Sequence, residues 1–128
     1  MTHTKEVVFS PEAPAPIGPY SQAIKAGNLL FVSGQIAIEK SSGQLRVVDI
    51  ETETRQVMYN IGEILKAAGM TFSNVVKCTI FLSDMQQFAT VNEIYASYFG
   101  DKPPARETVQ VARLPKDVNV EISCIAVK

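Results

Sequence analysis

One arginine and one glutamate in the last quarter of the chain are placed where they can do chemistry. Arg106 closely follows Pro103-Pro104, which stiffens the chain and sets the angle at which the next segment leaves. Glu121 is predicted to lie in a strand, on the face opposite to the apolar residues of the run 118–122. A guanidinium can grip a carboxylate through two hydrogen bonds, and an acid can take a proton from water. Together the pair indicates hydrolysis of a small anion, although an arginine or glutamate taken alone is usually a solvated surface residue.

Few other side chains are suited to catalysis. His3 is the sole histidine, which argues against a histidine-based metal site and against a Ser-His-Asp triad. Cys78 and Cys124 are the only cysteines, and both fall in apolar strand patterns. They are predicted to be buried free thiols that behave as small hydrophobic groups. A disulfide or a nucleophilic thiol is a less favoured alternative, because neither cysteine has a histidine near it in the sequence.

Length and composition limit the class of protein. The 128 residues predict one domain over 1–128, and the hydrophobic share of 46% favours an oligomer. A net charge of −1 without a basic run argues against nucleic acid as the main partner. The polar start 2–6 is unlike a signal peptide, and no apolar run is long enough to span a membrane. The expectation is a soluble, cytoplasmic protein.

The pattern of apolar residues predicts an α/β (α+β) fold. Strands are expected at 7–9, 29–32 and 75–82, and two more follow residue 104. One further strand, given in parentheses in the order below, is placed between residue 33 and Asp49. Residues 10–19 form a loop with four of the seven prolines. A first helix begins at Asp49 as N-cap and ends before Gly69. The resulting order, β-β-(β)-α-β-α-β-β, predicts a mixed sheet with both helices on one face.

The second helix has its own start and end signals. Ser83 or Asp84 is expected to cap it, and Gly100 to close it. Its inner face is predicted to hold six apolar or aromatic residues: Met85, Phe88, Val91, Ile94, Tyr95 and Tyr98.

The other face of this sheet has no helix to cover it. The run 29–32 is apolar on both faces, and Ile125 and Val127 also point to the uncovered side. An apolar face of this kind needs a cover, and another copy of the chain is the simplest one.

Six short motifs occur in an order that resembles the RidA (YjgF) family. They are Ile17-Gly18-Pro19-Tyr20-Ser21-Gln22, Ser33-Gly34-Gln35, Phe88-Ala89-Thr90-Val91-Asn92, Pro104-Ala105-Arg106, Val111-Ala112-Arg113-Leu114-Pro115 and Val120-Glu121-Ile122. The resemblance extends from about Ser10 to the C-terminus. It implies a chorismate-mutase-like (RidA-like) fold that assembles as a homotrimer, with sites in the clefts between subunits.

The resemblance also implies an activity. Members of the family are 2-iminobutanoate/2-iminopropanoate deaminases, hydrolases of reactive enamine and imine acids such as 2-aminoacrylate. These acids are released by pyridoxal-phosphate enzymes, and the products are 2-keto acids and ammonia. The reaction needs neither an organic cofactor nor a metal, so small 2-imino and 2-keto acids are the implied partners.

Residue roles follow by resemblance at matching positions. Arg106 resembles the arginine that binds the substrate carboxylate, and Glu121 resembles the acid that activates water. Tyr20, Ser33 and Gly34 match positions that line the pocket, where the Ser33 hydroxyl and the Gly34 N–H are available to substrate or water.

Three further positions carry narrower implications. Asn92 matches an asparagine near the cleft. Thr108 stands where well-known relatives have cysteine, in a role attributed mainly to backbone groups, so thiol chemistry is absent there. Glu107 replaces a residue that is often small and leaves the substrate preference open.

Two alternative functions remain. One is a non-catalytic trimeric module that binds small 2-keto acids or regulates a partner. The presence of Glu121 favours the enzyme, because a carboxylate-binding protein does not need that acid. The other is an RNA-acting protein, against which the slightly acidic charge and the lack of a basic or aromatic stripe argue.

Overall fold

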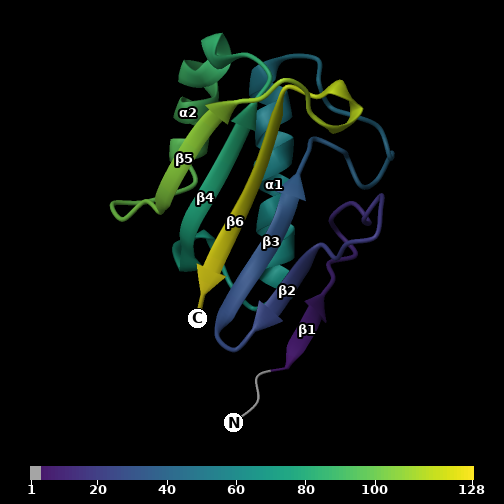
Figure 1. Cartoon of the computed structure of the whole chain (residues 1–128), viewed down its shortest axis with the longest axis vertical. Coiled ribbons are helices and arrows are strands. Elements are labelled where there is room, and N and C mark those ends of the chain that lie inside the picture. Colours follow the sequence, from purple (N-terminus) through teal and green to yellow (C-terminus); the bar gives the residue numbers. More distant parts are fainter. Residues whose placement is uncertain (1–3) are drawn as a thin grey trace.

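The computed structural model describes residues 4–128 and contains six strands and two α-helices (Figure 1). His3 lies outside the described residues. The elements are β1 (Lys5–Val8), β2 (Ala23–Ala26), β3 (Leu29–Gln35), α1 (Ile50–Ala67), β4 (Val75–Leu82), α2 (Phe88–Ala96), β5 (Ala105–Gln110) and β6 (Val120–Val127). None of the helices in this part of the chain has the length and apolar character needed to cross a membrane.

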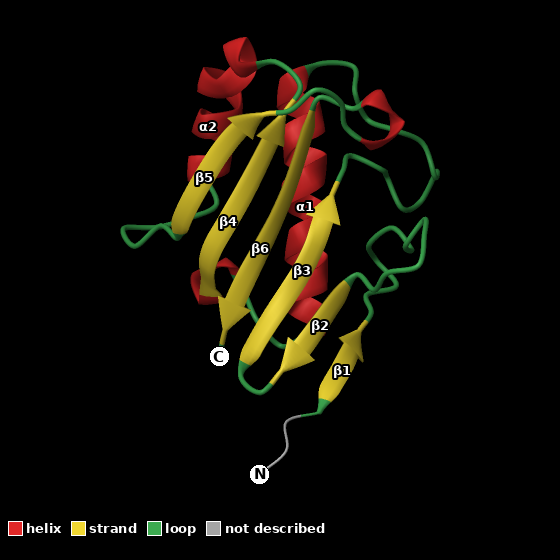
Figure 2. Ribbon diagram, viewed as in Figure 1, coloured by secondary structure: helices red, strands yellow, loops and turns green. Residues whose placement is uncertain are grey.

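The strands form one mixed sheet in the order β1-β2-β3-β6-β4-β5. Only β4 and β5 pair in parallel, and the other neighbours are antiparallel. Both helices lie behind the sheet in Figure 2, so they cover the same face. The predicted α/β arrangement, with two helices on one face of a mixed sheet, is confirmed.

The start and end signals of α1 are as predicted. The Asp49 carboxylate accepts a hydrogen bond of 2.7 Å from the Thr52 N–H, which satisfies one of the free donors at the helix start. Gly69 follows the helix with a φ of +72°, a backbone conformation that glycine adopts without steric cost.

The second helix differs from its prediction at both ends. Asp84 caps a short 3₁₀ turn, Met85–Gln87, and the α-helix itself runs only from Phe88 to Ala96, before Gly100. A 3₁₀-helix has three residues per turn, so the α-helical period of 3.6 residues that predicted an inward Met85 does not apply there. Met85 is 39% exposed, and its predicted place on the inner face is wrong.

β2 was not predicted as a strand. Its sequence, Ala-Ile-Lys-Ala, contains residue types that are rare in strands, and its place is decided by pairing with β1 and β3. The further strand placed between residue 33 and Asp49 is not present as a separate element. β3 continues to Gln35, and beyond it there is one isolated bridge, Ile38 to Leu45.

The core fills the space between the helices and the sheet. Its large, fully buried side chains include Leu30, Ile61, Ile64, Leu65, Ile80, Leu82, Val91 and Ile122. On β3, Leu30 and Val32 face this core, whereas Phe31 points to the other side and is 42% exposed. The chain therefore buries only one of the two apolar faces predicted for this strand. We call the uncovered side the open face; by register, its residues on β3 to β6 include Leu29, Phe31, Lys77, Thr79, Phe81, Ala105, Glu107, Val109, Glu121, Ser123, Ile125 and Val127.

Candidate active site

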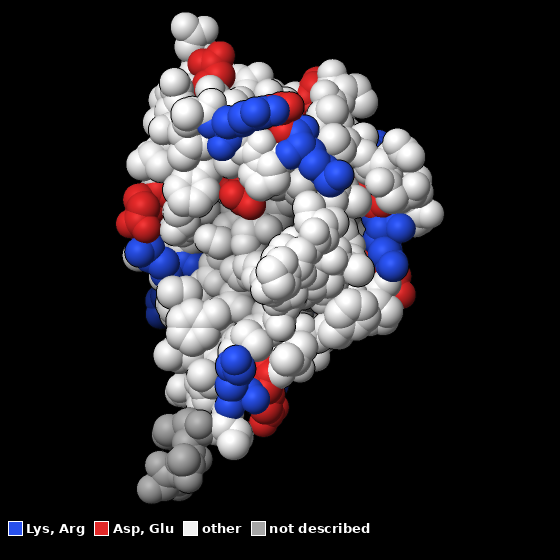
Figure 3. All heavy atoms as spheres, turned by 45° about the vertical axis from the view of Figure 1, so that its right-hand side comes forward, with Lys and Arg blue, Asp and Glu red and all other residues white. Residues whose placement is uncertain are grey.

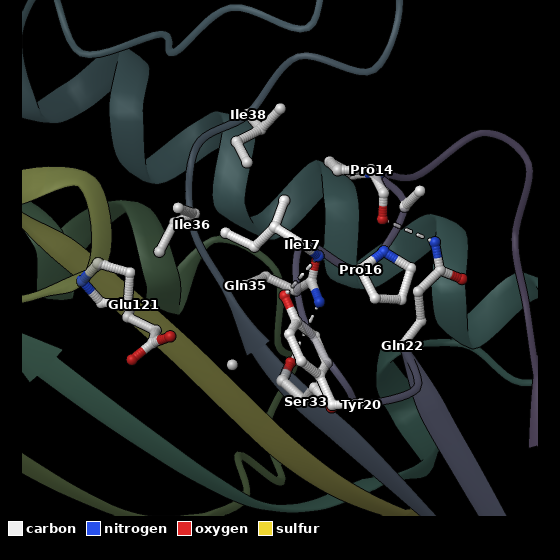
Figure 4. Close-up of a pocket in the computed structure, with 13 residues that line it drawn as sticks. Pro14, Pro16, Ile17, Tyr20, Gln22, Ser33, Gln35, Ile36, Ile38 and Glu121 are labelled. Carbon is white, nitrogen blue, oxygen red and sulfur yellow. Dashed lines mark hydrogen bonds between the residues drawn. The ribbon is translucent and has the colours of Figure 1, made fainter.

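A cavity of about 340 Å³ opens beside the end of β3 and contains Glu121 in its wall. The proline-rich loop contributes Pro14, Pro16, Ile17 and Tyr20, and β3 contributes Ser33 and Gly34. Ile36, Ile38 and Pro115 complete an apolar wall. Figure 4 shows Glu121 on one side of the space, with Tyr20 and Ser33 on the other. Charged side chains lie mostly around the edges of the hollowed surface in Figure 3.

The proline-rich loop is held in place by the buried amide of Gln22. Its Oε1 accepts from the Ser10 N–H at 2.6 Å, and its Nε2 donates to the carbonyls of Ser10 (3.1 Å) and Pro14 (2.8 Å). Prolines lack an N–H, so a loop rich in them cannot satisfy its own carbonyls. Sequence reasoning assigned no role to Gln22, although that shortage of donors is the signal that points to it.

The opposite wall is held by Asn60 on α1. This fully buried side chain donates to the carbonyls of Ile36 (3.1 Å) and Ile38 (3.0 Å), and its Oδ1 accepts from Gln56. The segment after β3 has almost no strand partner, so these two bonds set its path. No pattern in the sequence indicates this contact, because the partners are backbone carbonyls more than 20 residues away.

Glu121 lies on the open face and is half-buried. It packs directly against Gly34, where an added methyl group would meet the Glu121 Oε2 at 2.7 Å and Cγ at 3.0 Å. Between residues 4 and 128 no hydrogen bond or ion pair holds the carboxylate. Burial disfavours the charged form and raises the pKa of Glu121 above its ordinary value. The cavity therefore contains an unpartnered carboxyl group with increased proton affinity, as a general base requires.

Tyr20 and Ser33 line the same cavity, across the space from this carboxyl group. The Tyr20 hydroxyl accepts from the Ile17 N–H at 3.3 Å, and its proton is free for another acceptor. Ser33 donates its hydroxyl proton to the Ser21 carbonyl at 2.6 Å. The Ser33 oxygen is therefore available as an acceptor rather than as a donor.

Arg106 belongs to a second group of residues, between β5 and α2. Its Nη1 donates to the Asn92 Oδ1 at 2.8 Å. The guanidinium carbon lies 5.0 Å from the centre of the Tyr95 ring and 5.6 Å from that of Phe88, close enough for cation–π attraction. A cavity of about 460 Å³ opens here, bounded by Asn92, Tyr95, Ala96, Phe99, Gly100, Pro103, Pro104 and Arg106.

The two residues that follow Arg106 on β5 have different surroundings. Thr108 shares the Arg106 face, and its buried hydroxyl has no partner within residues 4–128. Glu107 points to the open face, where it pairs with Lys77 at 2.9 Å and accepts from Thr79 at 3.3 Å. The hydrogen bond from Lys77 lowers the pKa of Glu107, and by register the side chain lies on the face opposite to Arg106.

Arg106 and Glu121 lie on opposite faces of the sheet. Arg106 is the register partner of Cys78, whose neighbour on β6 is Cys124, on the helix-covered side. Glu121 is the register partner of Phe81, on the open face. Within one chain the structure brings Tyr20, Ser33, Gly34 and Glu121 together, and separately Asn92, Arg106 and Thr108. The single Arg–Glu site suggested by the sequence is not formed inside one chain.

Comparison with known proteins defines the family. Residues 10–128 match the family model described as Endoribonuclease L-PSP. The chain is 56% identical to a RutC family protein of Pyrococcus horikoshii, covering 97% of this chain and 98% of the relative. It is 50% identical to a mouse protein named 2-iminobutanoate/2-iminopropanoate deaminase, over 97% and 92% of the two chains. The crystal structure of the Escherichia coli YjgF gene product superposes with a TM-score of 0.91 at 41% identity, over 96% and 98%. The chain belongs to the RidA (YjgF, L-PSP) family.

The fold is that of solved RidA-family structures, as the sequence motifs predicted. Relatives about 50% identical to this RidA-family chain are named as imine deaminases. Within residues 4–128 no group of three or more His, Cys, Asp or Glu side chains is arranged to hold a metal ion.

Both cysteines of this RidA-family chain are free and buried, as predicted. They are register partners on β4 and β6, beneath the helices. Burial raises the pKa of both thiols, which keeps them in the unreactive protonated form.

Replacing Gly34 with alanine is expected to displace the Glu121 carboxyl group. The φ of Gly34 is not in the left-handed region, so the backbone accepts alanine and only the Glu121 side chain must move. Moved outward, the carboxyl group regains water, and its pKa should fall towards the ordinary value of about 4.3. The pKa is measured by ¹³C NMR titration of the carboxyl carbon. Gly100→Ala, where nothing lies within 4 Å of the added methyl, is the control. An unchanged Glu121 pKa in Gly34→Ala would contradict this account.

Proposed function

We propose that this chain is a 2-iminobutanoate/2-iminopropanoate deaminase, which hydrolyses imine and enamine acids to 2-keto acids and ammonia. The observation that carries the proposal is that one chain holds two complementary groups of side chains, which line separate cavities. One group contains a guanidinium suited to a carboxylate, and the other contains a carboxyl group in a cavity that has no partner among residues 4–128. About 50% identity to proteins with this name supports the choice of substrate.

The two groups suit a site that forms between copies of the chain. Period-two alternation keeps Arg106 and Glu121 on opposite faces, so a substrate held by one chain's Arg106 must meet the Glu121 of another. The exposed apolar side chains of the open face, among them Phe31 and Val109, favour burial against another copy. We infer a homotrimer with its sites in the clefts between subunits.

Arg106 would hold the α-carboxylate of the substrate. Asn92 takes one N–H of the guanidinium, and the planar group rests against Tyr95 and Phe88, which leaves its other N–H groups for a bidentate pair. Because these contacts exist before substrate binds, little side-chain entropy is lost when the pair forms.

Glu121 would activate the attacking water. Water adds to the carbon of the protonated imine as Glu121 takes one proton from the water, giving a neutral carbinolamine. The same carboxyl group then protonates the nitrogen, and ammonia leaves as the hydroxyl proton passes back to Glu121 and the carbonyl forms; Glu121 releases that proton to solvent before the next turnover. An enamine such as 2-aminoacrylate first gains a proton from solvent at carbon to become the protonated imine. Only the deprotonated carboxylate can start this sequence. Activity should therefore fall as the pH drops through the raised pKa of Glu121.

Substitutions at Arg106 test the proposed binding of the carboxylate. Loss of a charge-assisted pair costs about 2–4 kcal/mol, so Arg106→Ala should lower kcat/KM by ~30-fold or more. Arg106→Lys keeps the charge without the fork and should recover only part of this loss. The assay generates the imine with a threonine dehydratase and follows the release of 2-ketobutyrate. No imine hydrolysis by the wild-type protein would refute the proposed function, and full activity in Arg106→Ala would refute the role of Arg106.

Glu121→Gln separates an enzyme from a non-catalytic binding module. Glutamine keeps the size of the side chain but cannot take a proton from water near neutral pH, so turnover should drop by ~10²–10⁴-fold. Binding of 2-ketobutyrate, measured by calorimetry, should persist, and sedimentation should show the same oligomer as the wild type. Unchanged turnover with intact assembly would place water activation elsewhere and favour the binding module.

Mixing the two inactive variants tests whether sites are shared between chains. In a mixed oligomer, some sites pair the Arg106 of a Glu121→Gln chain with the Glu121 of an Arg106→Ala chain, and these sites are intact. Co-refolding or co-expression should therefore restore a measurable fraction of wild-type activity. The double variant Arg106→Ala/Glu121→Gln mixed with Glu121→Gln is the control, because no combination of these chains gives a complete site. Without recovery in a mixed oligomer of the two single variants, the shared site would be wrong.

A further inference from the structure

Glu53, on the first turn of α1, is a fully buried carboxylate with no cationic partner in the part of the chain that the structure describes. Its exposed fraction is 0%, and none of the ion pairs within residues 4–128 includes it. Three N–H groups satisfy it instead. Oε2 accepts from the backbone of Asn119 at 2.7 Å and of Val120 at 3.2 Å, while Oε1 accepts from the Asn119 Nδ2 at 2.7 Å. Burying a carboxylate is costly, and these charge-assisted bonds offset that cost.

All three donors belong to the two residues that precede Glu121. The backbone enters β6 at this point, so Glu53 ties the start of that strand to α1, 66 positions away in the sequence. Asn119 is also held by the residue that follows β4, because its carbonyl accepts a hydrogen bond from the Ser83 N–H at 3.0 Å. The backbone immediately before Glu121 is therefore fixed from both α1 and the end of β4.

The segment that leads into this point is strained. Lys116 and Asp117 have φ values of +56° and +55°, in the left-handed region that non-glycine residues seldom adopt. Two such residues in succession persist only where the surrounding structure holds them. Pro115, in the same turn, also lines the cavity. A change in this turn would therefore move both the cavity wall and the start of β6.

If this backbone moved, the carboxyl group of Glu121 would move with it. No hydrogen bond within residues 4–128 holds its carboxyl group, and its position is set by its own backbone and by contact with Gly34. Misplacement of a reacting group by about 1 Å can cost ~10²-fold in rate.

We propose that Glu53 is a positioning residue for Glu121, acting through the amides of Asn119 and Val120. The inference rests on the proposed function, since it assumes that Glu121 activates water. A negative charge also suits the first turn of α1, where the positive end of the helix dipole lies.

Glu53→Met and Glu53→Gln test this role as a pair. Methionine has a similar length but leaves the three N–H groups without this acceptor. Glutamine keeps an oxygen for the two backbone N–H groups, and the Asn119 amide can turn to accept from its Nε2. Glu53→Met should therefore lower kcat by ~10-fold or more with KM within ~2-fold, while Glu53→Gln stays within ~3-fold of the wild type. Amide hydrogen exchange at Asn119 and Val120 should quicken in Glu53→Met alone.

Thr54→Val is the matched control. Thr54 is the next residue, is also fully buried, and donates its hydroxyl proton only to the Ile50 carbonyl of its own helix at 2.7 Å. It should lose stability without losing kcat. If Glu53→Met does not fold, Glu53→Asp replaces it; its carboxylate is one methylene shorter and should give an intermediate loss of kcat.

The outcomes are distinguishable. A wild-type protein that does not hydrolyse imines refutes the proposed function, and the positioning role with it. An active wild type together with a Glu53→Met variant of unchanged kcat, despite faster exchange at Asn119 and Val120, refutes the positioning role alone. The positioning role is also refuted if Thr54→Val loses as much kcat as Glu53→Met.

Discussion

The alternation of side chains along a β-strand is the constraint on which the candidate site depends. It places Arg106 and Thr108 towards α2, and Glu121 towards the open face, with the full sheet between them. A one-residue slip of either strand would place Arg106 and Glu121 on the same face and turn a charged side chain towards the core. The pairing of β4 with both β5 and β6 fixes the register of the two strands at once, so the separation of the two groups is a property of the fold.

Buried polar side chains define the walls of the cavity next to Glu121. Gln22 holds the proline-rich loop, Asn60 holds the segment after β3, and Glu53 holds the start of β6. Gln22 and Asn60 bond to backbone carbonyls of segments with few partners in the sheet, and Glu53 bonds to backbone N–H groups where β6 begins. Such contacts are strongly directional, and an apolar replacement would leave backbone groups unsatisfied. The cavity is thus shaped by hydrogen bonds from the core, while its surface is largely apolar.

Local signals in the sequence predicted much of the fold. Apolar periodicity located α1, β4 and β6, and the Asp49 cap and Gly69 located the ends of α1. β2 could not be predicted in this way, because Ala-Ile-Lys-Ala becomes a strand only through its neighbours. Met85 was misplaced because a 3₁₀ turn interrupts the helical period.

The site was predicted less completely than the fold. Motifs identified Tyr20, Ser33, Gly34 and Glu121, which do line one cavity, and Asn92 and Arg106, which do line another. That these are two separate groups depends on which strands are neighbours, and no local pattern carries that information. Gln22, Asn60 and Glu53 act through backbone atoms of distant segments, so residue type alone could not reveal their roles.

The two thiols lie opposite each other on β4 and β6, two neighbouring interior strands of the sheet. Both are buried beneath the helices, so a thiol-specific reagent reaches them only when the helices lift or the sheet opens. The rate at which the native protein takes up such a reagent therefore measures how often its centre opens. No label has to be introduced, and the residues that line the two cavities are left untouched.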